Sequence, residues 1–166
     1  MKSSKSIAIL LALALPSATV DAVEISAKAL QVARRNVSDY ALNERVRLAP
    51  GDLFAPLLNR QYELIVANPP YVTSAAMDDL PAEYRHEPQI SLAGGSDGLE
   101  IVRKILAAAP EHLTPGGTLI MEIGHARSRV EAAFPRLPFT WLEIDGVDDA
   151  VLLLHRAQLA RARAKR

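Results

Sequence analysis

The chain has 166 residues, of which 49% are hydrophobic and 23% charged, so it is large enough for one globular domain and is not disordered by composition. Nineteen basic and nineteen acidic residues give a formal net charge of zero, which excludes a strong overall field toward nucleic acid. The absence of cysteine excludes disulfides and thiolate metal sites.

The first sixteen residues allow two interpretations. Two lysines precede an apolar run over residues 7–15, and small residues follow Pro16. This pattern is typical of a signal peptide, although the run is too short to span a bilayer. It also fits a buried helix that leads through Pro16 into a strand, and composition does not separate the two.

Residues 18–25 are predicted to form a strand, and Ser26 is a good N-cap for a helix to about residue 41. Glu24 lies at the carboxyl end of that strand, where an acid can accept hydrogen bonds from both hydroxyls of a ribose. A solvated carboxylate near a helix N-terminus is the alternative for Glu24. The apolar positions predict a helix that covers a sheet: Ala29, Leu30, Val32, Ala33 and Val37.

A short strand is predicted over residues 45–49, followed by Gly51, Asp52 and Leu53. Taken from its neighbours alone, Asp52 is a turn residue. The next strand is predicted at residues 63–67, a continuous apolar run of the kind found in parallel strands that are covered on both faces.

The tetrapeptide Asn68-Pro69-Pro70-Tyr71 follows this strand directly. In open α/β sheets, ligands bind beyond the carboxyl ends of strands. Two prolines fix φ near about −65° and keep Asn68 out of helical geometry, so the loop is stiff. A plain proline turn after a strand is the alternative.

These residue types suit the use of a planar amine or amide nitrogen as a nucleophile. The Asn68 side-chain oxygen and the Pro69 carbonyl can accept its N–H bonds and favour the positive charge that develops. Tyr71 can cover the planar group, and a rigid loop contributes by positioning.

Residues 72–98 are predicted to form a long loop that holds no phosphate-binding or zinc-protease motif. After it, Asp97 or a neighbour caps a helix to residue 109. A turn at residues 114–117 leads to a strand at 118–123 in which Met121 fills the core, and residues 127–134 form a short helix. Residues 139–145 and 150–155 are predicted to form an antiparallel hairpin. His112, His125 and His155 lack the spacing of metal ligands, so no metal is expected.

The tetrapeptide behind an apolar strand resembles the motif of amino-methyltransferases. Residues 80–106, LPAEYRHEPQISLAGGSDGLEIVRKIL, are similar to the HemK family of protein glutamine methyltransferases. The segments LPAEYRHEP and PFTWLEID most resemble its PrmB branch, whose substrate is a glutamine of large-subunit ribosomal protein number three.

This resemblance implies an α/β fold, the class I (Rossmann-like) sheet of S-adenosyl-L-methionine-dependent methyltransferases with a C-terminal antiparallel hairpin. It implies methylation of a glutamine amide, with Asn68, Pro69, Pro70 and Tyr71 as catalytic residues. It also implies the residues that bind the methyl donor: Glu24 binds the ribose, Asp52 and Leu53 contact the adenine, and Asn68 contacts the donor as well.

The resemblance also favours the helix interpretation of the N-terminus. It implies a cytoplasmic protein that binds neither a membrane nor a metal. The positions before that helix hold no glycine, which implies that the first strand, the glycine-rich donor loop and a substrate-recognition domain are lacking. The catalytic domain is expected at residues 1–159, with a basic tail at 160–166 that is able to contact ribosomal RNA. A DNA or RNA base amino-methyltransferase and an inactive remnant are the alternatives.

Overall fold

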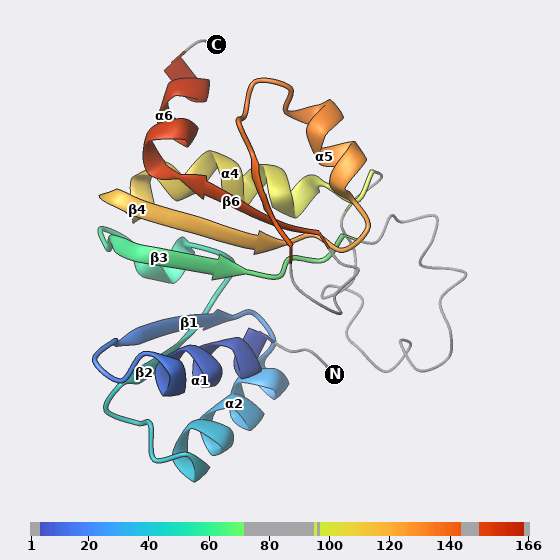
Figure 1. Ribbon diagram of the computed structural model, residues 1–166. Coiled ribbons are helices and arrows are strands. Elements are labelled where there is room, and N and C mark those ends of the chain that lie inside the picture. The colour runs from blue at the N-terminus through green and yellow to red at the C-terminus, as the bar shows by residue number, and fades with distance from the viewer. Residues whose placement is uncertain (1–3, 72–94, 96, 144–149, 165–166) are drawn as a thin grey trace. The chain divides into compact units, whose positions relative to one another are not determined.

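The computed structural model describes residues 4–71, 95, 97–143 and 150–164. The chain divides into two compact units, Met1–Arg60 and Gln61–Arg166 (Figure 1), and each is described by itself. The long loop predicted after the tetrapeptide lies almost wholly outside the described residues, as does the turn of the predicted hairpin.

The first unit contains two parallel strands and two α-helices. Its elements are α1 (Ser4–Ala14), β1 (Val20–Glu24), α2 (Ala27–Asp39), β2 (Val46–Pro50) and the short 3₁₀ helix η1 (Ala55–Leu57). Strand β1 pairs with β2 in register from Val20 opposite Val46 to Glu24 opposite Pro50. The carboxyl ends of both strands therefore lie next to each other.

The N-terminal segment forms a helix with a buried face, as one of the two sequence interpretations predicts. Ala8, Ile9 and Ala12 of α1 pack into one core cluster with Val37 and with further residues of this unit: Leu42 and Val46. A helix of this length is only marginally stable by itself. Because α1 contacts β1 and β2, it is stabilised mainly by the burial of these side chains.

Helix α2 begins where the sequence predicts. The Ser26 hydroxyl accepts a hydrogen bond from the Ala29 amide at 3.2 Å, which satisfies one of the unpaired donors of the first turn. Leu30, Ala33 and Val37 are buried, but Val32 is 50% exposed. The prediction that Val32 faces the sheet is wrong, because the buried stripe of this helix is narrower than the apolar pattern.

The second unit is built on a mixed sheet in the order β3-β4-β6-β5. Its elements are β3 (Tyr62–Ala67), α4 (Glu100–His112), β4 (Leu113–Glu122), α5 (Arg127–Ala133), β5 (Thr140–Leu142), β6 (Val151–His155) and α6 (Arg156–Ala164). Strand β3 is parallel to β4, and β6 is antiparallel to both β4 and β5. The predicted terminal antiparallel pair is confirmed.

Helices α4 and α6 contact each other and pack on β4. The core of this unit includes fully buried Leu119, Met121 and Leu152, so the prediction that Met121 fills the core is confirmed. Leu159 of α6 is also buried, and the Arg156 side chain donates to the Pro110 carbonyl at 2.9 Å. Helix α6 is thus part of the packed unit. None of the helices in the described part of the chain has the length and apolar character that a membrane span requires.

Two details of this unit differ from the sequence expectation. Residues 114–117 were expected to turn, but β4 runs through them, with a register irregularity opposite Tyr62 and Leu64. Gly117 permits this because its Cα comes so close to β3 that an added Cβ would lie 2.8 Å from the Tyr62 carbonyl. Strand β3 was expected to be covered on both faces, yet Leu64 is 36% exposed.

The described strands form two hydrogen-bonded sheets, one in each unit. Among the described strands, β1 is hydrogen-bonded to β2 and β3 to β4, so each of β1 and β3 has a strand neighbour on one side.

The α4 helix is longer than predicted. It continues through Pro110 to His112, where the Arg156 bond to the Pro110 carbonyl supports its last turn.

Candidate functional site

The tetrapeptide lies where β3 ends, beside its parallel neighbour β4. Ala67, the last residue of β3, is paired with Met121, so Asn68 leaves the sheet next to the buried part of β4. Pro69 is buried, whereas Asn68, Pro70 and Tyr71 are half-buried. The Asn68 side chain is therefore placed at the carboxyl edge of a parallel strand pair, the position that the sequence predicts.

Two glycines from other segments lie against Tyr71. A Cβ added to Gly124, in the turn between β4 and α5, would lie 2.4 Å from ring atoms Cε2 and Cζ of Tyr71. A Cβ added to Gly98, just before α4, would lie 2.5 Å from the Tyr71 carbonyl oxygen. The ring and the backbone of Tyr71 thus rest on bare Cα atoms of two segments that are distant in sequence.

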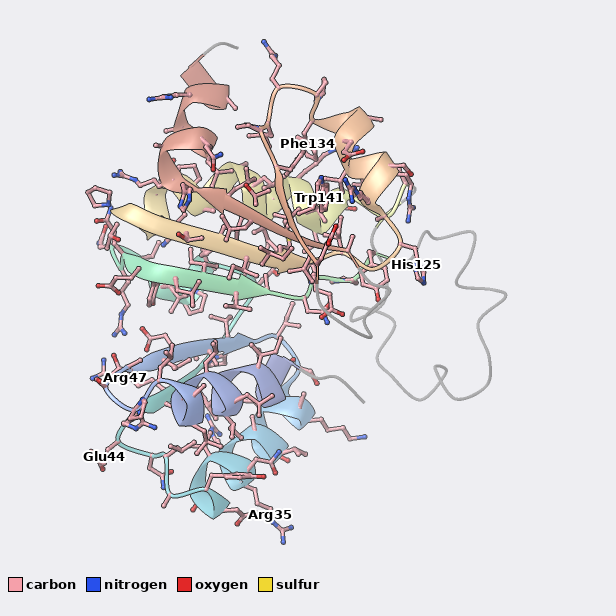
Figure 2. All side chains as sticks on the ribbon, viewed as in Figure 1. Arg35, Glu44, Arg47, His125, Phe134 and Trp141 are labelled. Atoms are coloured by element: carbon pink, nitrogen blue, oxygen red, sulfur yellow. The ribbon has the colours of Figure 1, made fainter. Side chains whose placement is uncertain are left out.

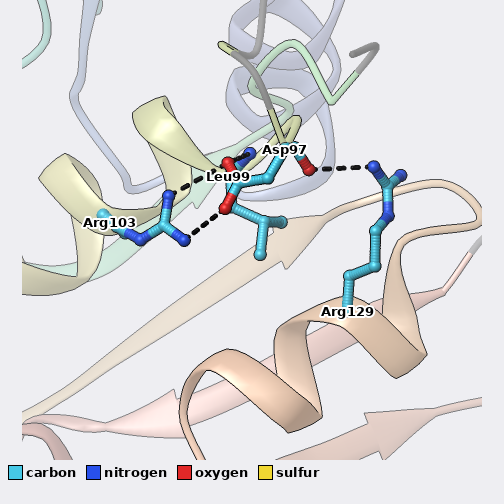
Figure 3. Close-up of polar contacts among 4 residues, drawn as sticks. All are labelled: Asp97, Leu99, Arg103 and Arg129. Atoms are coloured by element: carbon cyan, nitrogen blue, oxygen red, sulfur yellow. Dashed lines mark hydrogen bonds and ion pairs between the residues drawn. The ribbon is translucent and has the colours of Figure 1, made fainter.

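A polar network holds the segment that contains Gly98 (Figure 3). The Asp97 carboxylate accepts hydrogen bonds from the Leu99 amide at 3.0 Å and from both terminal nitrogens of Arg103, one of them at 3.0 Å. From α5, Arg129 donates to the Asp97 carbonyl at 2.9 Å. These contacts tie the residue before Gly98 to α4 and to α5.

The electrostatics of this network follow from its geometry. The Arg103 side-chain hydrogen bond, with help from the Leu99 amide, lowers the pKa of Asp97 from 3.8 to about 2. The same bond raises the pKa of Arg103. Both side chains remain about half exposed, so the pair serves geometry more than stability.

The sequence predicts that Asp97 or a neighbour caps α4, and it does not predict the rest of the network. The N-cap of α4 is Leu99, which makes no side-chain cap bond, and the Asp97 carboxylate accepts from the Leu99 amide. The six-residue spacing between Asp97 and Arg103 is not the three- or four-residue spacing of helical pairs, so no local pattern predicted their contact. Arg129 is 32 residues away, so no local pattern could have brought it in.

In the first unit, Glu24 and Asp52 follow two neighbouring strands. Glu24 is half-buried at the end of β1, and its Oε1 accepts from the Ser26 amide at 2.9 Å. Its carbonyl accepts from the Gly51 amide at 3.2 Å, so the loop after β2 is fixed to the end of β1. Asp52 is exposed and Leu53 is half-buried with a φ of +47°.

The structure therefore brings together Glu24, Asp52 and Leu53 in the first unit. Within the second unit, it brings the tetrapeptide together with Gly98 and Gly124. That the two groups act on one donor molecule remains a prediction. The Ser26 contact also matches the alternative interpretation of Glu24 as a carboxylate at a helix N-terminus.

A hollow of about 300 Å³ lies in the second unit beside α5, and Figure 2 labels two of its lining residues, Phe134 and Trp141. Its lining is apolar apart from Glu131, which pairs with Arg127 at 3.2 Å. The Arg127 guanidinium lies 4.6 Å from the centre of the Trp141 ring. This lining offers no set of groups for acid, base or nucleophilic chemistry.

Titratable side chains show no metal-binding arrangement in the described ranges, where no three His, Asp or Glu residues gather. His155 contacts the Thr118 hydroxyl at 3.1 Å across the β4–β6 pair.

Comparisons with known proteins agree with this architecture. Residues 6–83, which include the tetrapeptide, match the model of the methyltransferase small domain. A ribosomal protein uL3 glutamine methyltransferase from Bordetella pertussis is 54% identical over 92% of this chain and 51% of its own length. The chain thus spans about half the length of this curated relative.

Solved structures share the fold at low sequence identity. A methyltransferase from Pyrococcus furiosus superposes with a TM-score of 0.64 and 21% identity, covering 91% of this chain and 69% of its own. An RNA methyltransferase from Salinibacter ruber, in complex with S-adenosyl-L-homocysteine, gives 0.57 and 15%, covering 92% and 75%. The expected class I fold and the resemblance to the glutamine methyltransferases are both confirmed. The chain has the class I methyltransferase fold, and over 92% of its length it is similar in sequence to a ribosomal protein uL3 glutamine methyltransferase.

Proposed function

We propose that the protein methylates the side-chain amide nitrogen of a glutamine in a large-subunit ribosomal protein, with S-adenosyl-L-methionine as methyl donor. The observation that carries this proposal is the placement of the tetrapeptide at the carboxyl edge of β3, in a chain 54% identical to a uL3 glutamine methyltransferase. The curated relative supplies the substrate class. The tetrapeptide supplies acceptors for a planar nitrogen.

The residues of the first unit fit a nucleoside. Glu24 and Asp52 place two carboxylates beyond the ends of two adjacent parallel strands, and the Gly51–Glu24 bond holds their loops together. In the proposal, Glu24 accepts hydrogen bonds from the ribose hydroxyls, Asp52 accepts from the adenine amine, and Leu53 packs on the ring. The donor, when bound, supplies an electrophilic methyl group on a sulfonium.

The second unit orients the nucleophile. A glutamine amide nitrogen is a poor nucleophile because its lone pair is delocalised into the carbonyl. The Asn68 side-chain oxygen and the Pro69 carbonyl each accept one N–H bond of that amide. These acceptors turn the lone pair toward the methyl group and stabilise the positive charge that develops on nitrogen. Formation of the N–CH₃ bond would break the S–CH₃ bond and leave a thioether, and the nitrogen would then release one N–H proton.

Stiffness gives this arrangement its catalytic value. Pro69 and Pro70 have fixed φ angles, and Pro69 is buried, so the two acceptor oxygens keep their directions before substrate arrives. Tyr71 covers the planar amide. In the proposal, Asn68 also contacts the methyl donor. We place this activity in the cytoplasm, where ribosomal proteins are assembled.

A methylation assay with three substrate classes tests the proposal. The protein is offered the donor with ribosomal protein uL3, DNA or RNA, and each product is analysed by mass spectrometry for an added methyl group. Methylation of one glutamine in uL3 supports the proposal. Methylated adenine or cytosine, with uL3 unmodified, would show that the protein methylates nucleic-acid bases and would reject the proposal.

Variants link the activity to the tetrapeptide. Asn68→Ala removes one acceptor and is expected to lower turnover by about 100- to 1,000-fold, as the loss of one preorganised polar group does elsewhere. Asn43→Ala is the matched control, since Asn43 is exposed in the first unit. Equal turnover of the two variants would remove Asn68 from the mechanism.

A further inference from the structure

Tyr71 is fixed on two sides by glycines that local sequence patterns do not connect with it. Gly124 has a φ of +51°, and its Cα lies so close to the Tyr71 ring that an added Cβ would be 2.4 Å from two ring carbons and 2.9 Å from the hydroxyl oxygen. Most side chains at Gly124 would be strained in the left-handed region, and any of them would displace the ring.

Gly98 approaches the backbone of the same residue. Its φ is +74°, and an added Cβ would lie 2.5 Å from the Tyr71 carbonyl oxygen. Backbone atoms cannot rotate away as a side chain does, so a residue larger than glycine would shift either the loop before α4 or Tyr71 itself.

The segment around Gly98 is braced against such a shift. Arg129 donates to the Asp97 carbonyl at 2.9 Å, and its Nη1 would lie 2.9 Å from a Cβ on Gly98. On the other side, the Asp97 carboxylate bonds Arg103 and the Leu99 amide of α4. Because Gly98 is held between α4 and α5, Tyr71 would have to give way.

We propose that Gly98 and Gly124 are positioning residues for the transfer reaction. The inference rests on the proposed function and adds the residues that set the place of the tetrapeptide. A Cβ contact becomes ordinary at about 3.4 Å, so substitution at Gly124 moves Tyr71 by about 1 Å. The two prolines pass this shift to Asn68, and a misplacement of about 1 Å can cost about 100-fold in rate.

Two other glycines of the same unit serve as matched controls. Gly95 also has a positive φ, of +84°, but an added Cβ would meet Cβ and Oε2 of Glu100, each at 3.0 Å, and not Tyr71. Among the described residues, nothing lies within 4 Å of a Cβ on Gly116. Gly95→Ala therefore reports backbone strain and a close contact that does not involve Tyr71, and Gly116→Ala reports the change of residue alone.

Two readouts separate positioning from general damage. The four tyrosines are labelled with 3-fluorotyrosine, and the ¹⁹F resonance of Tyr71 is assigned by its loss in Tyr71→Phe. Steady-state kinetics with uL3 give kcat and KM for the donor. Gly124→Asn is made beside Gly124→Ala, because asparagine tolerates a positive φ and carries the same Cβ.

Gly124→Ala and Gly98→Ala are expected to shift the Tyr71 resonance and to lower kcat by about 10- to 100-fold, with little change in the KM for the donor. Gly95→Ala and Gly116→Ala are expected to leave both unchanged. In a Tyr71→Ala background, Gly124→Ala is expected to add no further loss, since no ring remains to be displaced.

An unchanged Tyr71 resonance in both Gly124 variants, or a kcat no lower than that of Gly95→Ala, would overturn the inference. If the wild-type protein methylates no glutamine, the proposed function fails and the positioning role fails with it. The resonance of Tyr71 in Gly124→Ala distinguishes that case, because it reports the packing without any turnover.

Discussion

Arg45, the residue before β2, caps the C-terminal end of α1, and its loss should loosen that helix. Its guanidinium donates to the carbonyl of Ala12 and to the carbonyls of Leu15 at 3.1 Å, Pro16 at 2.5 Å and Ala18 at 3.4 Å. The last carbonyls of a helix have no partner within it, and a cation at this end is favourable with the helix dipole. Arg45 thus bonds one of the last carbonyls of α1, that of Ala12, and three carbonyls of the segment that follows the helix.

The magnitude follows from the kind of bond that is lost. A hydrogen bond from a charged donor contributes about 1.5–3 kcal/mol when it is shielded and close to nothing when fully solvated. The bonds to Ala12 and Ala18 are partly buried, and the other two are exposed. Arg45→Ala should therefore lower the free energy of opening of α1 by about 2 kcal/mol, a factor of about 30 in the opening equilibrium.

Hydrogen exchange with mass spectrometry measures this directly in the peptide that covers α1. Arg47→Ala is the matched control, because Arg47 is an exposed arginine of β2, labelled in Figure 2. Arg45→Lys should fall between the two, since it keeps the charge but loses the forked geometry. Equal protection of α1 in Arg45→Ala and Arg47→Ala would refute the capping role.

Two further predictions concern the second unit. The folded pKa of Asp97, about 2, lies below its usual 3.8, so its contribution to stability is fully present above pH 3.8 and is lost as the pH falls through about 2. The difference in urea midpoint between wild type and Asp97→Asn should shrink over that pH range. A difference that stays constant would contradict the claim that the ionised Asp97 stabilises the fold through Arg103. Met121→Ala should lower the free energy of unfolding by about 2–5 kcal/mol, because Met121 is fully buried beside Ala67. A loss below about 1 kcal/mol in urea unfolding would show that the core collapses around the gap.

Local patterns were sufficient where one segment determines its own structure. Ser26 marked the start of α2 because its hydroxyl satisfies a donor three residues on. The apolar run before Asn68 predicted β3, and its lack of alternation predicted that the strand is parallel to its neighbour. For the same reason the tetrapeptide was identified as a candidate site, since its residue types and its place after a strand are visible in sequence.

Features that depend on distant partners were not predictable in this way. The turn expected at residues 114–117 became part of β4, because Gly117 packs against the carbonyl of Tyr62, a residue more than fifty positions earlier. The helix predicted to end at residue 109 continues through Pro110 to His112, and Arg156 donates to the Pro110 carbonyl.

The candidate site shows the same division. Asn68 and Glu24 were identified from the ends of their own strands. The contacts of Gly98 and Gly124 with Tyr71 required the tertiary structure, as did the bond from Arg129 to the Asp97 carbonyl. Glycine patterns in sequence indicate turns, and they do not tell which side chain fills the space that a missing Cβ leaves.

The rate of methyl transfer in a single turnover tests the central claim most directly. The protein is saturated with S-adenosyl-L-methionine, mixed with ribosomal protein uL3, and the methylated glutamine is quantified with time for wild type, Asn68→Ala and Asn43→Ala. The account predicts a wild-type rate for Asn43→Ala and a rate at least about 100-fold lower for Asn68→Ala. Transfer by Asn68→Ala at the wild-type rate would contradict the assignment of the tetrapeptide as the group that orients the amide.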